Sequence, residues 1–205
     1  MYKDYGFQSP EPNWSDSYVV PELRRMLGAP RGPILDIGCG NGAIARALLL
    51  DGFDVYGVDA STSGIKIAEA GSPGRFFLHD LMDEGIPAAL ADKRFVTVIS
   101  TEVLTHMYAP RRLVEFARRM LVEGGDLIIS APYHGYLKNL ALALSGKMDA
   151  HFTSLWEGGI IKFFSRETLE RLLHEQGFTV TEFAGAGRAP FLWKSMLVKA
   201  TLDRR

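Results

Sequence analysis

The chain has 205 residues, 47% of them hydrophobic and 23% charged, and its formal net charge is −1. This length and composition are typical of a single domain with a substantial core. The balanced charge argues against a nucleic acid or an anionic membrane surface as a partner. Cys39 is the only cysteine, which excludes an intramolecular disulfide and suits a reducing compartment, so we expect a cytoplasmic protein.

The apolar pattern of the chain contains no targeting signal. The first residues lack the apolar stretch that a secretory signal needs. The longest apolar runs, such as 43–50, fall well short of the roughly 20 residues of a membrane span. We therefore expect no integral membrane association, and one domain over residues 1–205 with a helical segment at 1–30.

Strands and helices alternate along the first two thirds of the chain. Leu23, Met26 and Leu27 recur at helical spacing and predict a helix over 15–28. Apolar runs and periodicity then predict strands at 33–37, 53–58, 75–78, 95–100 and 126–131, and helices at 41–50, 62–70 and 110–121. Such alternation is typical of an α/β fold, with a mostly parallel sheet and helices on both faces. Its ligand crevice lies beyond the carboxyl ends of the strands.

The chain closes with a helix and two apolar segments. Ser165 is expected to cap the helix, which ends near Gly177. The apolar segments 178–184 and 191–200 are joined by a short loop without a helix, so they must pair antiparallel. A parallel sheet that ends in such a hairpin is less typical of a dinucleotide dehydrogenase.

The stretch ILDIGCGNG, residues 34–42, is an apolar run that breaks into alternating glycines. Gly38, Gly40 and Ala43 fit the dinucleotide-binding spacing G-x-G-x-x-G/A, which indicates a nicotinamide or flavin cofactor. Asp36 stands two residues before the first glycine, however, and a carboxylate is an unusual neighbour for a pyrophosphate. The motif by itself does not decide whether the ligand carries a pyrophosphate.

Four acidic residues lie where the predicted strands end. Asp36 is at the end of the first strand, Asp59 ends the second, and Asp80 and Glu102 follow the third and the fourth. Asp59 can accept hydrogen bonds from both hydroxyls of a ribose, and Asp80 can accept one from the exocyclic amine of an adenine. Asp36 favours a positive charge nearby. S-adenosylmethionine (SAM) combines these features.

The motifs LDIGCGNG, GVDAS, HD and LVEGGDLIIS occur in this order between residues 34 and 131. The series resembles that of class I SAM-dependent methyltransferases. The resemblance implies a Rossmann-like, seven-stranded sheet whose last strand is antiparallel. It also implies that the glycines line the methionine portion of SAM, that Asp59 holds the ribose and that Asp80 with Leu81 holds the adenine. The residues expected at the cofactor are Asp36, Gly38, Cys39, Gly40, Asn41, Asp59, Ala60, Asp80, Leu81 and Thr101.

Within this family the chain is most similar to the small O-methyltransferases related to those of ubiquinone biosynthesis. The segments PYHGYLKNLALAL, GGIIKFFS and GAGRAPFLWKSM carry this similarity. Two positions depart from the pattern. The ubiquinone enzymes have Glu-x-x-Glu-His after the fourth strand, whereas here Thr105 replaces the middle carboxylate between Glu102 and His106, so we expect no metal site. Ile160 stands where the similar bacterial proteins usually have histidine.

Three residues are candidates for catalysis. His106 lies just past the fourth strand and suits general base work at neutral pH. Its alternative role is that of a helix-start histidine bonded to backbone. Glu102 is expected to accept a hydrogen bond from the SAM amino group or to orient His106; the alternative is that it only faces solvent. His134 follows the fifth strand and is the third candidate.

Residues 132–164 are rich in Tyr, His, Gly and Trp, with a weak helical pattern at 137–144. So long an irregular segment is usually functional or disordered, and this one is too aromatic for disorder. We interpret it as a lid over the acceptor. Alternatively, its side chains pack within a turn or within the lid itself and do not contact the acceptor. The residues expected at the acceptor are Tyr133, Tyr136, His151, Trp156, Lys162 and, from the N-terminal side, Trp14.

These observations favour a SAM-dependent methyltransferase that transfers a methyl group to a hydroxyl of a small molecule by in-line displacement. The chain could instead methylate nitrogen or carbon, because one sequence does not determine the acceptor atom. A nicotinamide-dependent oxidoreductase is supported only by the glycine spacing and Asp59. A non-catalytic SAM-binding protein would not need an aromatic lid.

Overall fold

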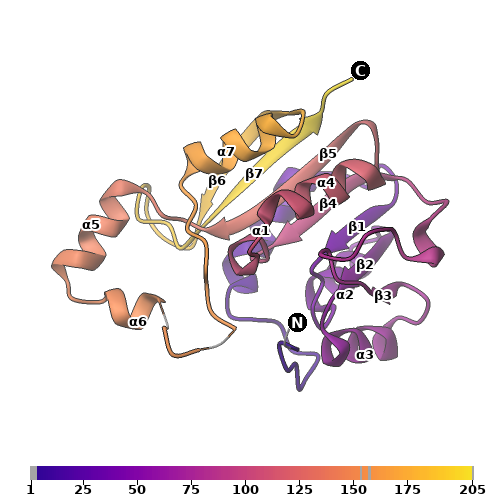
Figure 1. Ribbon diagram of the computed structural model, residues 1–205, viewed down its shortest axis with the longest axis horizontal. Coiled ribbons are helices and arrows are strands. Elements are labelled where there is room, and N and C mark those ends of the chain that lie inside the picture. The colour runs from indigo at the N-terminus through magenta and orange to yellow at the C-terminus, as the bar shows by residue number, and fades with distance from the viewer. Residues whose placement is uncertain (1–3, 153, 157, 205) are drawn as a thin grey trace.

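The computed structural model describes residues 4–152, 154–156 and 158–204. Its centre is a seven-stranded sheet with the order β3-β2-β1-β4-β5-β7-β6 (Figure 1). The strands are β1 (Ile34–Ile37), β2 (Val55–Asp59), β3 (Phe76–Leu78), β4 (Phe95–Thr101), β5 (Leu121–Pro132), β6 (Phe178–Ala186) and β7 (Ser195–Leu202). Neighbours among the first five strands pair in parallel, whereas β7 pairs antiparallel with both β5 and β6. The α/β fold and the antiparallel hairpin are therefore confirmed.

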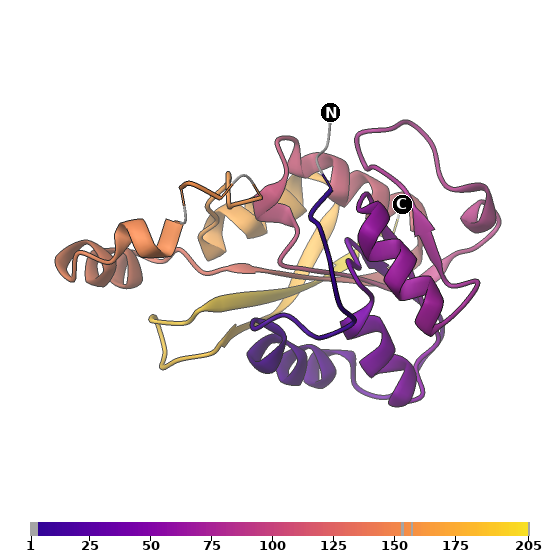
Figure 2. The same cartoon turned by 90° about the horizontal axis from the view of Figure 1, so that it is seen from below.

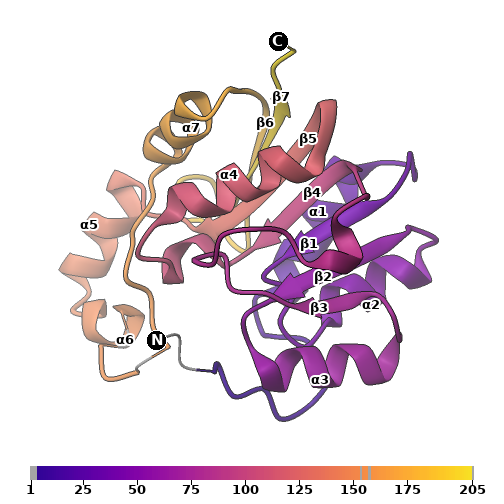
Figure 3. The ribbon, with the colours of Figure 1, turned by 45° about the vertical axis from the view of Figure 1, so that its right-hand side comes forward.

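Helices cover both faces of the sheet (Figures 2 and 3). Their bounds are α1 (Asp16–Leu27), α2 (Ala43–Leu50), α3 (Thr62–Gly71), α4 (Pro110–Met120), α5 (Tyr136–Leu144), α6 (Met148–Phe152) and α7 (Arg166–Glu175), with 3-10 turns η1 (Ala88–Leu90) and η2 (Leu104–His106). α4 and α7 pack on one face of the sheet, and α1, α2 and α3 on the other. Alternate strand residues supply the two cores: Leu127 and Ile129 face the first, Ile128 the second. Within the described residues, no helix is long and apolar enough to cross a membrane.

The predicted elements are found within a few residues of their expected bounds, with two differences. β5 begins at Leu121 rather than at Asp126, because Leu121 pairs with Phe95 before the regular register starts at Thr97. Gly124, with φ +68, forms the bend inside this strand instead of a turn ahead of it. The second difference is α6, which is too short to leave a periodic pattern.

α5 and α6 form an arm beyond the carboxyl ends of the strands, beside the loop that joins β6 to β7 (Figures 1 and 2). The chain then returns toward the sheet. The amides of Ile161 and Lys162 both donate to the Thr105 carbonyl, at 2.9 and 3.0 Å. Tyr133 forms a bridge with Phe164. The arm is thus attached to the sheet at its start and to η2 at its end.

The N-terminal segment, residues 4–11, crosses the end of the sheet before α1 begins (Figure 2). The Asn41 amide donates to the carbonyls of Ser9 and Glu11, at 2.9 and 2.8 Å. Arg46 donates to the Pro10 carbonyl at 2.5 Å. Buried Asn41 therefore ties this segment to the turn after β1.

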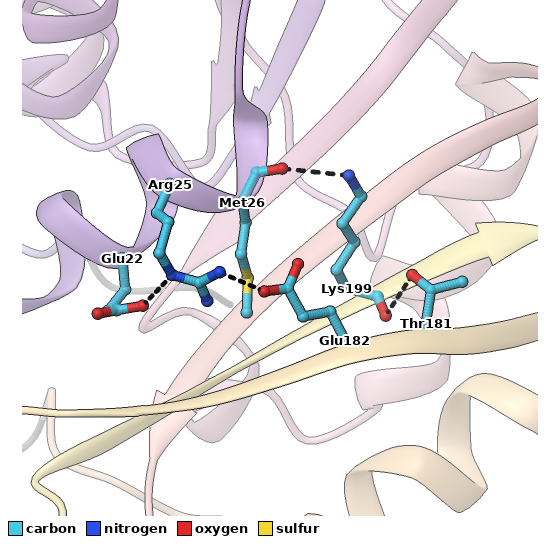
Figure 4. A network of polar contacts seen from close by, with 6 residues as sticks. All are labelled: Glu22, Arg25, Met26, Thr181, Glu182 and Lys199. Carbon is cyan, nitrogen blue, oxygen red and sulfur yellow. Dashed lines mark hydrogen bonds and ion pairs between the residues drawn. The ribbon is translucent and has the colours of Figure 1, made fainter.

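Charged side chains join α1 to the antiparallel edge of the sheet (Figure 4). Arg25 bonds Glu22 of its own helix and Glu182 of β6. Lys199 of β7 donates to the Met26 carbonyl at 3.1 Å and lies 3.2 Å from the carboxylate of Asp126. The pair of Lys199 and Asp126 is at a buried site, because Asp126 is buried, whereas the pair of Arg25 and Glu182 is half exposed.

We expect Asp126→Asn to destabilise the protein by about 2 kcal/mol, because it weakens charge-assisted bonds at a buried site. Burial alone would raise the pKa of Asp126, but hydrogen bonds from Arg31, Thr201 and Lys199 hold it below its ordinary value. This stabilisation is present above a pH of about 4 and is lost as the pH falls through the lowered pKa. Urea unfolding at pH 7 and pH 3 measures both effects. The exposed pair is the control: Arg25→Ala should cost under about 1 kcal/mol, and equal losses would contradict the expectation.

Candidate active site

The glycine turn after β1 is held tightly against its neighbours. The amides of Gly38 and Cys39 both donate to the Val58 carbonyl of β2, at 2.8 and 3.1 Å. Gly38 has φ +77, and a Cβ added there would lie 2.3 Å from a methyl carbon of Val103. Glycine is required here for both backbone conformation and space. The close contact brings the loop after β4 directly onto the turn.

Asp36 is a buried carboxylate beneath this turn, with 1% of its surface exposed. Its Oδ1 has no hydrogen-bond partner among the described residues. Burial, together with the charges of Asp59 and Asp16, raises the pKa of Asp36 to about 8. A carboxylate in this position is costly without a partner, so it fits a ligand that brings a positive charge.

Asp59 ends β2 and braces the glycine turn. Its Oδ2 accepts from the Gly40 amide at 2.8 Å and its Oδ1 from the Ser61 amide at 2.6 Å. Burial raises its pKa, although these hydrogen bonds oppose the shift. Each carboxylate oxygen keeps lone-pair capacity that the hydroxyls of a ribose could use.

Part of the N-terminal segment covers the glycine turn, which the sequence did not reveal. Asp4 accepts from the hydroxyls of Ser61 and Ser63, and from the Ser63 amide at 2.9 Å. The Phe7 amide donates to the Ser63 hydroxyl. The Phe7 ring packs on Gly40 so closely that a Cβ added there would lie 2.7 Å from it. Residues 4–7 thus cover the first turn of α3 and the glycine turn.

Other residues expected at the cofactor have various surroundings. The Cys39 side chain points into the core, where a Cβ on Gly57 would lie 2.7 Å from its Sγ, so only the Cys39 backbone can face a ligand. Asp80 is half-buried after β3, and its Oδ1 accepts from the Met82 amide at 2.9 Å. Three more residues are half-buried at the carboxyl ends of β2, β3 and β4: Ala60, Leu81 and Thr101.

Glu102 follows β4 with φ +58, a rare conformation for a residue with a side chain. Its amide donates to the carbonyl and the hydroxyl of Ser130, at 3.2 and 3.0 Å. Its Oε1 accepts from the Ser130 hydroxyl at 2.8 Å. Burial raises the pKa of Glu102 to about 7, against hydrogen bonds from Ser130 and Ser195. The strained backbone is held by β5, and the carboxyl group titrates near neutrality.

His106 lies at the end of η2 and contacts the segment that the sequence predicts to be a lid. Its Nδ1 pairs with the Gly159 carbonyl at 3.0 Å, so Nδ1 carries the proton and Nε2 keeps its lone pair. The Trp156 ring lies edge-on, with centroids 6.2 Å apart. His106 therefore retains the means to act as a base, but the hydrogen bonds of Glu102 go to Ser130 and not to this imidazole.

His134 and His151 come together in the arm, with ring centroids 5.4 Å apart. The Nδ1 of His134 pairs with Asn139 Oδ1 at 3.2 Å. Burial, with the nearby charge of Lys138, lowers the pKa of His134 to about 4. The rings of Phe152 and Phe163 lie beside this pair, so the imidazoles are flanked by aromatic side chains.

The remaining residues expected at the acceptor do not converge. Tyr133 is buried in the core and stacks edge-on against Trp193, with ring centroids 5.1 Å apart. Tyr136 is 79% exposed, and Lys162 is exposed as well. Trp14 is exposed beside Tyr18. Tyr133 and Tyr136 therefore do not face one acceptor together, because the Tyr133 ring is packed in the core.

Sequence reasoning missed Lys138, which is buried beside the two histidines. The available signal was its place as the only charged residue of the apolar helix sequence YLKNLALAL. Ser130 and Ser195 were also missed, since serines in strands carry no pattern of their own. Among the described residues, no cluster of three or more His, Cys, Asp or Glu side chains is arranged to hold a metal ion.

Comparison with known proteins identifies the family and the fold. A family model described as a methyltransferase domain matches residues 14–182. The chain belongs to this methyltransferase family. It is 24% identical over 181 residues to a ubiquinone biosynthesis O-methyltransferase of Psychrobacter arcticus, covering 85% of this chain and 70% of that enzyme. The enzyme of the same description from Azorhizobium caulinodans is 30% identical over 159 residues, covering 74% and 60%.

A solved structure has the same fold. Magnesium protoporphyrin IX methyltransferase of Synechocystis PCC 6803, with bound S-adenosylhomocysteine (SAH), superposes with a TM-score of 0.65 at 20% identity, covering 97% of this chain and 91% of that chain. The methyltransferase is SAM-dependent. The unpartnered oxygen of Asp36 and the glycine turn fit the positively charged amino-acid end of SAM, which supplies the methyl group.

We expect Asp36→Asn to stabilise the ligand-free methyltransferase while weakening SAM binding. Because the folded state holds the Asp36 proton up to a pH of about 8, the group costs stability as the pH rises from about 4 to 8. Removal of the charge should therefore raise Tm at pH 8 by at least roughly 2–4 °C, with a smaller gain at pH 5.

Thermal scans at both pH values, and calorimetric titration with SAM, test this expectation. The affinity should fall at least about tenfold, since one charge pair is lost. Asp92→Asn, at an exposed position, is the control for removing one acidic charge. A destabilised Asp36→Asn protein that binds SAM normally would contradict the assigned role.

Proposed function

We propose that this methyltransferase transfers the methyl group of SAM to a hydroxyl of a small molecule. The observation that carries the proposal is Glu102, whose half-buried carboxyl group has a pKa of about 7 and whose neighbour Val103 packs on the glycine turn. A hydroxyl loses its proton on methylation, and a base that titrates near neutrality suits this task. The relatives named as O-methyltransferases support the same acceptor atom.

In the proposed step, the acceptor oxygen forms a bond to the methyl carbon as the bond between that carbon and sulfur breaks. The electron pair of the broken bond stays on sulfur, so SAH is the second product. The acceptor proton goes to the carboxylate of Glu102. The protein contributes alignment of the two reactants and exclusion of water. The described part of the proposed lid, residues 132–152, 154–156 and 158–164, is suited to this by its place beyond the strand ends.

Glu102 is preferred to His106 as the base for a geometric reason. Val103, which follows Glu102, packs on Gly38, and the Glu102 carboxyl group accepts a hydrogen bond from Ser130 of β5. Glu102 thus links the glycine turn to the strand that leads into the arm. His106 donates its Nδ1 proton to Gly159, an arrangement that also fits a role in holding the lid closed.

The acceptor atom is tested with the purified full chain, SAM and a panel of catechols, phenols, amines and activated-carbon compounds. SAH release reports turnover, and mass spectrometry with NMR of the product locates the methyl group. Methylation of hydroxyls is expected. Products methylated only on nitrogen or carbon would overturn O-methylation, and binding of NAD without SAM would overturn the whole proposal.

The base is tested by comparing Glu102→Gln with His106→Asn in single-turnover reactions from pH 5 to 9. In the wild type the rate should fall about tenfold per pH unit below a pH of about 7, as Glu102 becomes protonated. Glu102→Gln should lower the rate at pH 8 by about 10²-fold and abolish this pH dependence. His106→Asn should lower it less than tenfold and leave the dependence in place. The opposite pattern would assign the base to His106.

A further inference from the structure

Lys138 is an unusual member of α5. It is buried, with 6% of its surface exposed, whereas the other described residues of this helix are exposed or half-buried. Its ammonium donates to the Lys194 carbonyl at 3.2 Å. No described carboxylate lies within ion-pair distance of it. An ammonium has three donors, and a buried one without an anion is costly, so this arrangement calls for a further partner.

The surroundings of Lys138 are positive or neutral. Arg188, from the loop between β6 and β7, acts on Lys138 and His151 through its charge. Burial, with this charge, lowers the pKa of Lys138 to about 8. Two imidazoles complete the group: the Nε2 atoms of His134 and His151 are both buried and have no hydrogen-bond partner among the described residues.

Lys138, His134 and His151 thus lie together where β5 leads into the arm, and the exposed Arg188 of the β6–β7 loop adds its positive charge. His134 is 7% exposed, and its Nε2 atom is buried without a hydrogen-bond partner among the described residues. The rings of Phe152 and Phe163 border the same space. Positively charged donors bordered by aromatic rings match an anionic group attached to a planar ring.

We propose that Lys138 and Arg188, with the two imidazoles beside them, bind an oxyanion group, a carboxylate or a phosphate, carried by the methyl acceptor. The imidazoles join as donors. When the Asn139 amide is turned over, so that its NH₂ group instead of Oδ1 faces Nδ1 of His134, the imidazole proton is on Nε2 and is available to the anion. Only the statement that the ligand is the acceptor rests on the proposed function.

Glu102 is the one described carboxylate that raises the pKa of Lys138 through its charge, and Lys138 in turn lowers the pKa of Glu102. The two groups therefore influence each other without forming an ion pair. An alternative role for Lys138 is to keep Glu102 ionised, as a positioning residue. This alternative needs no anion, so the two roles give different results in a binding experiment.

The binding experiment uses the full chain saturated with SAH and three probes that cannot be methylated on a hydroxyl: benzoate, phenyl phosphate and benzamide. Benzamide is the neutral counterpart of benzoate in size and shape. Calorimetry gives the affinities, and NMR of the imidazole rings reports on His134 and His151. Lys138→Met removes the charge at similar length, and Lys147→Met, at an exposed site in the same arm, is the matched control.

We expect an anionic probe to bind at least tenfold more tightly than benzamide and to shift the resonances of both histidines. The preferred anion, benzoate or phenyl phosphate, then distinguishes a carboxylate from a phosphate subsite. Lys138→Met should remove the preference, Lys138→Arg should retain most of it, and Lys147→Met should leave it unchanged. Equal binding of benzamide and both anions would overturn the proposal, as would a preference that survives in Lys138→Met.

Turnover gives a second readout. Among hydroxylated acceptors compared in pairs with and without the anionic group, the anionic member should have a KM at least tenfold lower, and Lys138→Met should abolish this difference. If Lys138→Met instead shifts only the pH profile for neutral acceptors, Lys138 acts on Glu102 and the anion site is refuted. Anion binding without hydroxyl methylation would refute the proposed function while the subsite stands.

Discussion

The contact between Gly38 and Val103 is the constraint on which both halves of the site depend. It presses the turn after β1 against the loop after β4, and the Val58 carbonyl and the Asp59 carboxylate hold that turn from the other side. The cofactor half of the site therefore has a rigid floor made of backbone. The acceptor half begins at the neighbouring residue, Glu102, whose left-handed backbone is fixed by Ser130. A larger residue at Gly38 would separate these two halves.

Buried ionisable groups are concentrated at this end of the sheet. Asp36, Glu102 and Lys138 all have pKa values moved toward the neutral form, and burial is the main cause in each. A folded protein gains no stability from such groups, and their clustering at the strand ends is typical of a site that binds charged ligands. The network of Asp126 and Lys199 at the opposite end of β5 and β7 differs, because there the charges are paired with each other.

Much of the fold followed from local patterns, because apolar periodicity and turn residues determine where strands and helices lie. Asp36, Asp59 and Glu102 could be predicted for the same reason, because each lies at or just after the carboxyl end of a strand. The contact of Phe7 with the glycine turn could not be predicted from the sequence, because it depends on where a segment without periodicity lies in the fold. Lys138 was overlooked because α5 presents its apolar side chains outward, so its lysine is buried against the usual rule.

The coupling between Lys138 and Glu102 has a consequence for catalysis. In the ligand-free protein the ammonium favours the ionised form of Glu102 and so lowers its basicity. An anion bound at Lys138 would neutralise this influence and raise the pKa of the carboxyl group. The base would become stronger when an anionic acceptor occupies the site, and proton transfer to it more favourable. Recognition of the acceptor and activation of its hydroxyl would then depend on the same pair of buried charges.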